Sequence, residues 1–323
     1  MRWLPGLLGS ARPLAKVQRR TPPFVAAHGD RRIVGQPHPR RVHDSEGVHR
    51  VSTPRPMATH GMEGELRWGY SQAINAGGLV HVAGQVPRDE AERPLVAPLP
   101  RTFARAFDLV DAALGQLGCD ADDLVYTQIF LRAKDVSEGQ ELFKERLGAV
   151  GSALSMIVVE GLNHPDYALE VSATAVAPPS ERTKTRMEKV SVSTGNPLDE
   201  RLGRAAAVRV GQLIYVSGQP SVGADGIAIS DSAFVAHYQR AFDNFVAAVV
   251  AAGGTAQDVV STHTFVTEPV PADDMDTVAK IHRAAVGTGA NRPASTLVRV
   301  GALSVEGAKV EITGVAVVAT DAT

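Results

Sequence analysis

Two glutamates stand in otherwise apolar stretches and are the side chains best suited to acid–base chemistry. Glu311 lies within Val310–Ile312, and Glu170 lies within Leu169–Val171. If each stretch is a strand, the carboxylate points to the face opposite its apolar neighbours. There it is either a solvated side chain or a partly desolvated one. In the second case its pKa is raised, and it could relay protons between water and a substrate.

A short turn that ends a buried strand occurs twice in the chain. Ile214–Gln219 reads Ile-Tyr-Val-Ser-Gly-Gln, and Val80–Gln85 reads Val-His-Val-Ala-Gly-Gln. Only the second copy carries a hydroxyl, on Ser217, which could donate a hydrogen bond to a substrate oxygen or simply serve the packing of the turn. No His-Asp pair lies near it in the sequence to activate it as a nucleophile.

The repeated turn belongs to a duplication of the whole pattern, which is the first feature to seek in a sequence. The matching segments keep their order and nearly their spacing: Ala106–Asp108 with Ala241–Asp243, Asp123–Val125 with Asp258–Val260, and Leu169–Val171 with Val310–Ile312. The chain is therefore expected to hold two domains of the same fold.

Hydrophobic periodicity predicts the order β-β-β-α-β-α-β-β, or close to it, in each half. This is an α+β arrangement in which one mixed sheet carries two helices on one face. In the first half the expected helices are 103–117 and 137–148, and the strands are 70–74, 79–83, 124–131, 156–159 and 168–176. Gly77-Gly78 is a turn signal between the first two strands and predicts a β-hairpin there. In the second half the helices are 234–252 and 273–286, and the strands are 206–210, 213–217, 259–267, 296–300 and 308–319.

Composition divides the chain into a basic leader and an acidic body. Residues 1–56 hold eleven Lys and Arg against three acids, a net charge of +8, so 57–323 carry −10 of the total of −2. The leader also has 8 of the 20 prolines and no periodicity, so we expect it to be disordered. It is a targeting peptide, an arm that binds nucleic acid or a partner, or an extension without function before Met57.

The expected domains are 57–178 and 190–323, joined by a polar linker at 179–189. An acidic body disfavours nucleic-acid binding, and no apolar run approaches the ~20 residues that span a bilayer. A single cysteine, Cys119, allows no intramolecular disulfide and favours a cytoplasmic setting. No spacing predicts a metal site, and no glycine-rich phosphate loop predicts a nucleotide, so no cofactor is expected.

Several phrases in this order resemble the Rid (YjgF-like) proteins, the reactive intermediate deaminases. They are Tyr70–Ala73, the two Gly-Gln turns, Arg292–Val298 and Lys309–Ile312. The resemblance covers about 66–178 and 190–320 and implies two tandem chorismate-mutase-like domains. It also implies assembly as a homotrimer, or as a pseudo-oligomer through the fused repeats, with ligand pockets in the clefts between adjacent subunits.

The resemblance further implies cofactor-free hydrolysis of 2-imino or 2-enamino acids to 2-keto acids and ammonia. A glutamate on the last strand positions water, which assigns Glu170 and Glu311. Backbone groups of the turn complete the pocket, which assigns Gly84 and Gly218. A pocket tyrosine is present as Tyr70 in the first half, whereas Arg204 stands in its place in the second.

The chain departs from this family at the arginine that holds the substrate carboxylate. Its positions carry Leu154 in the first half and Ser295 in the second. A hydroxyl is a poor substitute for a bidentate guanidinium. Arg204, Arg292 and Arg299 are therefore candidates to replace it, each with the alternative of an ordinary surface charge. Arg299 is four residues after Ser295, so the two would share one face of a strand.

The first hypothesis is thus a Rid-like hydrolase or deaminase acting on a small reactive imine, enamine or related carbonyl compound. The lost arginine leaves tautomerisation, dehydration or cyclisation open as related reactions. The alternatives are a homologue that binds a small molecule without catalysis, and a chorismatase-like hydrolase. The complete polar turn of the second half favours a pocket there.

Overall fold

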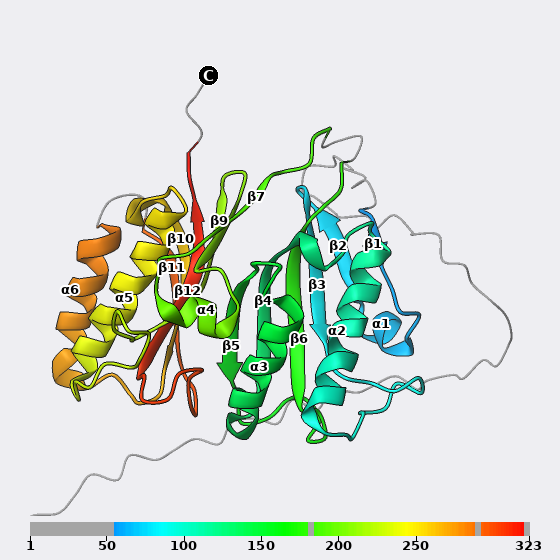
Figure 1. Ribbon diagram of the computed structural model, residues 1–323, viewed down its shortest axis with the longest axis horizontal. Helices are drawn as coiled ribbons and strands as arrows, with labels where there is room; N and C mark the ends of the chain where they lie inside the picture. The colour runs from blue at the N-terminus through cyan, green and yellow to red at the C-terminus, as the bar shows by residue number, and fades with distance from the viewer. Residues whose placement is uncertain (1–54, 180–183, 288–291, 320–323) are drawn as a thin grey trace, which may run out of the picture. The chain divides into compact units, whose positions relative to one another are not determined.

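The computed structural model describes residues 55–179, 184–287 and 292–319, and Arg55 onward forms one compact unit. The expected leader, 1–56, lies outside the described residues except for Arg55 and Pro56, and so do residues 180–183 of the linker. The order of elements repeats, as the duplication predicted. Figure 1 shows the helices and strands of the two halves.

Each half is a mixed six-stranded sheet with helices on one face. The first half contains β1 Met57–Ala58, α1 Glu63–Trp68, β2 Ala73–Ala76, β3 Leu79–Gln85, α2 Leu99–Gly115, β4 Leu124–Leu131, α3 Val136–Leu147, β5 Ala153–Val158 and β6 Leu169–Val176. The second contains β7 Lys189–Val192, α4 Pro197–Leu202, β8 Ala207–Val210, β9 Leu213–Pro220, α5 Phe234–Ala251, β10 Val259–Val266, α6 Met275–Val286, β11 Ala294–Arg299 and β12 Val310–Val317.

The two sheets have the same strand order. The first runs β1-β2-β3-β6-β4-β5, and the second runs β7-β8-β9-β12-β10-β11 when read from the same edge. Only β4 with β5 and β10 with β11 pair in parallel among the named strands. The predicted hairpin is confirmed, because β2 and β3 meet at Gly77 and Gly78, both with positive φ as such a turn requires.

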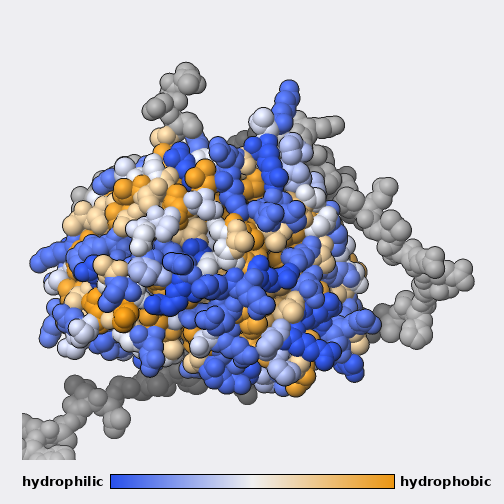
Figure 2. Space-filling model, in the orientation of Figure 1, coloured by the Kyte–Doolittle hydropathy of each residue, from blue (hydrophilic) through white to orange (hydrophobic). Residues whose placement is uncertain are grey.

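Apolar faces of the long helices fill each core. Phe103, Phe107, Val110 and Leu114 of α2 pack on the first sheet, and Phe242, Phe245 and Val249 of α5 pack on the second. Figure 1 shows α5 and α6 side by side on their sheet. On the face seen in Figure 2, hydrophobic residues are interspersed with hydrophilic ones.

The sequence-based element list was incomplete. It missed the six-residue helices α1 and α4, which are too short to show a helical period, and the edge strands β1 and β7. The observed order of each half is therefore β-α-β-β-α-β-α-β-β. Asn196–Pro197 was an available signal for α4: the Asn196 side chain caps the helix and Pro197 occupies its first turn.

The end of the expected linker is also part of the second sheet. Lys189 begins β7, and its ammonium donates to the carbonyl oxygens of Asp122, Leu124 and Val150 at 2.6, 3.1 and 3.0 Å. These acceptors all belong to the first half. The Lys189 ammonium therefore holds the start of the second domain against the first by these three hydrogen bonds.

Strand β5 of the first half packs on β9 of the second. Ala153 bridges Ala205, and the rings of Tyr126 and Tyr215 stack with their centroids 6.0 Å apart. All six residues of β5 are buried. The equivalent strand β11 is exposed along its whole length, so the two halves, although they share a fold, differ at this edge.

Candidate functional site

Strand β12 places Glu311 against the Gly-Gln turn of β9. A side chain on Gly218 would overlap the Glu311 carboxylate, so only glycine allows this approach. Glu311 is 2% exposed, and its Oε2 accepts a hydrogen bond of 2.9 Å from the Ser304 hydroxyl. Burial raises the pKa of Glu311, while the charge of Arg204 and the hydrogen bonds from Ser304 oppose that rise.

Arg204 enters the same cluster from the loop after α4 and is 7% exposed. Its Nε donates to Oδ1 of Asp199 at 3.3 Å, and Nη1 donates to the carbonyl oxygen of Gly218. Its Nη2 is buried without a hydrogen-bond partner among the described residues. The family tyrosine position is thus filled by a buried cation between two carboxylates, Asp199 and Glu311, which interact with its charge.

Ser217 is fully buried, and both of its hydrogen-bonding functions are used within the protein. Its hydroxyl donates to the carbonyl oxygen of Ala205 at 2.6 Å and accepts from the backbone N–H of Leu154 at 2.8 Å. Leu154 belongs to β5, so this hydroxyl joins the two halves. Leu154 stands at the position that the resemblance assigns to the carboxylate-binding arginine, and its backbone N–H donates to Ser217.

The first half builds the equivalent pair from Gly84 and Glu170. A side chain on Gly84 would overlap the Glu170 carboxylate, as at the second site. Here, however, the glutamate is only partly buried, and so are Gly84 and Arg88 beside it. Burial raises the pKa of Glu170, and the positive charge of Arg88 acts in the opposite direction.

Tyr70 lies at the end of a buried chain of polar groups in the first half. The Gln85 amide donates to Gln72 at 2.7 Å, and Gln72 donates to Glu65 at 2.8 Å and to the Tyr70 hydroxyl at 3.5 Å. Glu65 also accepts from the backbone N–H of His60 at 2.8 Å. This network holds the turn that carries Gly84 and explains why a glutamine follows the glycine.

The remaining candidates lie at the exposed strand β11. Ser295 is exposed and shares a hydrogen bond of 2.8 Å with the Thr262 hydroxyl, and β10 separates its strand from that of Glu311. Arg299 ends β11 and borders a groove that also involves Glu160, and Arg292 is exposed just before the strand. The structure therefore gathers Arg204, Ser217, Gly218 and Glu311 into one cluster, and Gly84 and Glu170 into another.

The sequence analysis did not identify three residues that contact or influence the two glutamates and Arg204. Asp199 pairs with Arg204, Ser304 contacts Glu311, and the charge of Arg88 lies near Glu170. Asp199 could have been found from the repeat, because it stands five residues before Arg204 as Glu65 stands five before Tyr70. Ser304 and Arg88 lie in loops whose course no periodicity predicts.

The described residues contain neither a helix that could span a membrane nor a cluster of metal-binding side chains. No helix in this part of the chain is long and apolar enough to cross a membrane. Within the same residues, no group of three or more His, Cys, Asp and Glu side chains is placed to hold a metal ion.

Comparison with known proteins places this geometry in a family. The family model described as Endoribonuclease L-PSP matches twice, at residues 64–177 and 203–318. A RutC family protein of Pyrococcus abyssi is 29% identical over 108 residues, which is 33% of this chain and 84% of that protein. The RutC family protein YjgH of Escherichia coli is 40% identical over 65 residues, 20% of this chain and 48% of YjgH.

Among solved structures, a Mycobacterium tuberculosis member of the YjgF/YER057c/UK114 family is 29% identical. It matches with a TM-score of 0.35, covering 38% of this chain and all of that one. The two matches of the family model cover five of the six strands of each sheet, the long helices and both Gly-Glu pairs. The chain belongs to the Rid/YjgF family and carries two tandem domains of it.

Proposed function

We propose that the protein is a cofactor-independent hydrolase of small imines or enamines and that its reactive site is the one around Glu170. The observation that carries this is the contrast in burial between the two equivalent carboxylates. Glu170 is partly exposed, whereas Glu311 is 2% exposed and already hydrogen-bonded to Ser304. A substrate must reach the carboxylate, and only the first site meets that need without rearrangement.

The proposed reaction needs one proton-transferring group and one cation. Glu170 as carboxylate takes a proton from water as the oxygen attacks the imine carbon, and its acid form gives that proton to the nitrogen, which leaves a carbinolamine. The carboxylate then takes the carbinol proton as the carbonyl forms and returns it to the nitrogen as the C–N bond breaks and ammonia leaves. An enamine is first protonated on carbon by the acid form. The rise in the pKa of Glu170 caused by burial favours its acid form and suits a group that must work in both protonation states.

Arg88 is the cation that we propose for an anionic group of the substrate. It is partly buried beside Glu170, where its charge opposes the rise in the carboxyl pKa. The family position for such an arginine carries Leu154 or Ser295 in this chain. An arginine from the loop after the turn would supply the same bidentate chemistry from a different element.

The test is an imine hydrolysis assay with the full-length chain. Imines generated by an amino-acid oxidase are supplied with semicarbazide as a competing trap, and keto-acid release is followed. Release faster than in buffer, lost in Glu170→Gln, supports the proposal. Release at the buffer rate sinks it. Thermal stabilisation by a substrate analogue without turnover would instead identify a binding homologue, and pyruvate release from chorismate would identify a chorismatase-like hydrolase.

We also propose that the first site is completed by a second copy of the chain. In the first half, β5 is wholly buried on the second half, while β11, its equivalent, exposes all six residues, with Leu297 at 48% and Val298 at 41%. The partner of β5 is β9, and the equivalent of β9 is β3, which carries Gly84. Self-association through β11 and β3 would therefore place a strand beside the Gly84 turn, along one side of the Glu170 site. Light scattering that gave only the mass of a monomer would contradict it.

A further inference from the structure

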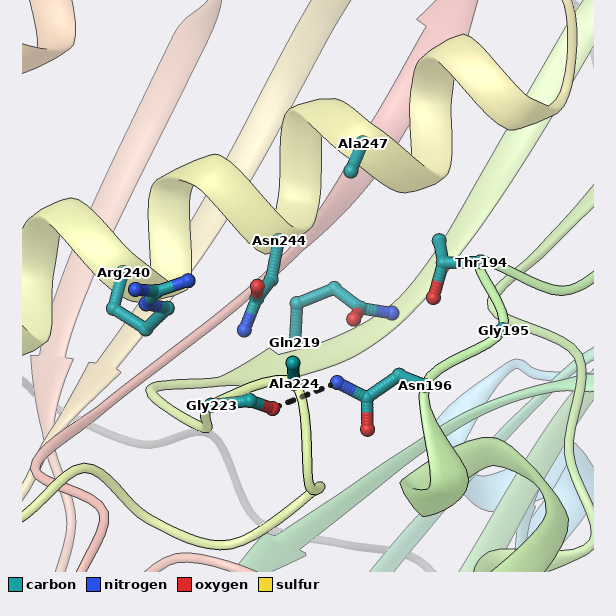
Figure 3. Close-up of a pocket in the computed structure, with 9 residues that line it drawn as sticks. All are labelled: Thr194, Gly195, Asn196, Gln219, Gly223, Ala224, Arg240, Asn244 and Ala247. Atoms are coloured by element: carbon teal, nitrogen blue, oxygen red, sulfur yellow. Dashed lines mark hydrogen bonds between the residues drawn. The ribbon is translucent and has the colours of Figure 1, made fainter.

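A second polar cavity lies on the other face of the second sheet. It has a volume of about 240 Å³, and its lining comes from α5, the end of β9 and two loops, as Figure 3 shows with Arg240, Asn244, Gln219, Thr194 and Asn196. In the pairing of β9 with β12, Gln219 is opposite Ile312, whose side chain belongs to the core under the helices. Glu311 is the next residue, so its side chain points to the opposite face, and this cavity is separate from the Gly-Glu site.

Hydrogen bonds to carbonyl groups fix how two amides of the cavity are turned. Nδ2 of Asn244 donates to the carbonyl oxygens of Pro220 and Val222 at 3.0 and 3.1 Å, and Nε2 of Gln219 donates to that of Ala206 at 3.3 Å. An amide nitrogen is a donor only, so the two amide oxygens are left as acceptors. The cavity therefore holds two oriented acceptors that can receive N–H donors of a ligand.

Arg240 supplies the complementary charge. It lies one turn before Asn244 on α5, is exposed, and makes no ion pair with any described residue. Its guanidinium offers several donors and the only charge in the lining. A ligand that satisfies all three groups has an acceptor with negative charge at one end and N–H donors at the other.

The first half shows that the fold does not require these groups. The equivalent of Arg240 is Arg105, whose Nε donates to the carbonyl oxygen of Arg88 at 2.7 Å and is thereby used within the protein. The equivalent of Asn244 is Leu109, which is buried in the first half. The same helix thus packs with an engaged arginine and a leucine in one half, and with a free arginine and an asparagine in the other.

We infer that this cavity binds a small α-amino acid. The carboxylate would pair with Arg240, and the ammonium would donate to Oδ1 of Asn244 and Oε1 of Gln219. Pairing of a guanidinium with a carboxylate is among the stronger contacts available at a protein surface. The exposed residues Thr194 and Ala224 at the rim leave an entrance, and the volume suits a side chain no larger than that of leucine.

Calorimetric titration of the full chain with L-alanine tests the inference. Acetate has the carboxylate alone and ethylammonium the ammonium alone, so each should bind at least about tenfold more weakly than L-alanine. Arg240→Gln should weaken L-alanine binding about ten- to a hundredfold. Asn244→Leu, which introduces the residue of the first half, should also weaken L-alanine binding, because it removes the Oδ1 acceptor.

Arg283→Gln is the matched control, because Arg283 is an exposed arginine on α6, away from the cavity lining. It should leave the affinity for L-alanine unchanged. Absence of heat with L-alanine at about 10 mM would overturn the inference. So would equal binding of L-alanine and acetate, or L-alanine binding that survives both Arg240→Gln and Asn244→Leu.

Discussion

The two Gly-Glu sites have the same arrangement of strand and turn, but the side chains and strands around the two glutamates differ. In both, a strand glutamate lies over the glycine of a Gly-Gln turn. At Glu311 the surroundings are a buried arginine, a serine hydroxyl and strand β5 of the other half. At Glu170 they are a partly exposed arginine, and among the described residues no strand takes the place that β5 has at the second site.

This difference follows from the fusion of two copies in one chain. One edge strand, β5, covers the turn of the other half, and Ser217 bonds to its backbone. Because this contact is made within one chain, the second Gly-Glu pair lies in the contact between the halves, where the buried Arg204–Asp199 ion pair fills the space beside it. The first site keeps an open carboxylate. The duplicated halves thus differ in packing: the second Gly-Glu pair lies in the contact between the halves, and the first is partly exposed.

Neutralising each glutamate in turn tests whether the two sites differ in function. Glu170→Gln should lower imine turnover about 10²- to 10⁴-fold, because a positioned proton-transferring group contributes that much. Glu311→Gln should leave turnover near the level of the parent. Keto-acid release under single-turnover conditions measures both. The reverse ranking would move the reactive site to the second half.

Arg204 provides the largest expected effect on stability. Arg204→Met leaves Asp199 buried without its partner, so the free energy of unfolding should fall by about 3–5 kcal/mol. Tyr70→Phe, at the equivalent place in the first half, removes only a long hydrogen bond of 3.5 Å and should cost less than about 1 kcal/mol. Urea denaturation of both variants compares them. Equal costs would show that Arg204 is not a structural ion.

Ser217→Ala tests the junction between the halves. It leaves the N–H of Leu154 buried without its acceptor and should cost about 1–3 kcal/mol. The matched change Ala83→Ser adds a hydroxyl at the partly exposed equivalent position, and we expect a change within about 0.5 kcal/mol. Thermal unfolding followed by circular dichroism measures both. If Ser217→Ala left the free energy of unfolding unchanged, the hydroxyl would not stabilise the contact between the halves.

The pH dependence of stability gives the smallest expected effect. The pKa of Glu311 is raised in the folded protein, so between its unfolded and folded pKa values only the folded state holds the proton. Stability from this group is therefore greatest at low pH and decreases as pH rises through that window. Glu311→Gln lacks this term, so the parent should gain stability relative to the variant as pH falls from 7 towards 5. A difference that is constant with pH would contradict the raised pKa.

Much of the fold could be predicted because local patterns carry it. The apolar periods of 103–117 and 234–252 found α2 and α5, and Gly77-Gly78 found the hairpin. The repeat matched the two glutamates, and the family resemblance assigned each of them and a turn glycine to one pocket; the structure places each glutamate against its glycine. The short elements α1, α4, β1 and β7 were missed, because four to six residues carry too little periodic signal and β1 has only two.

The preference for the second site was a prediction from residue types alone, since only that copy of the turn has a hydroxyl. The structure shows that this hydroxyl is committed to Ala205 and Leu154. Which carboxylate is open depends on β5, whose contact with β9 joins residues far apart in the chain. The sequence by itself determined the duplication, the family and the pair of carboxylates, because these follow from residue identity and spacing. Tertiary structure alone decided which carboxylate stays partly exposed, because burial is a property of packing between the halves.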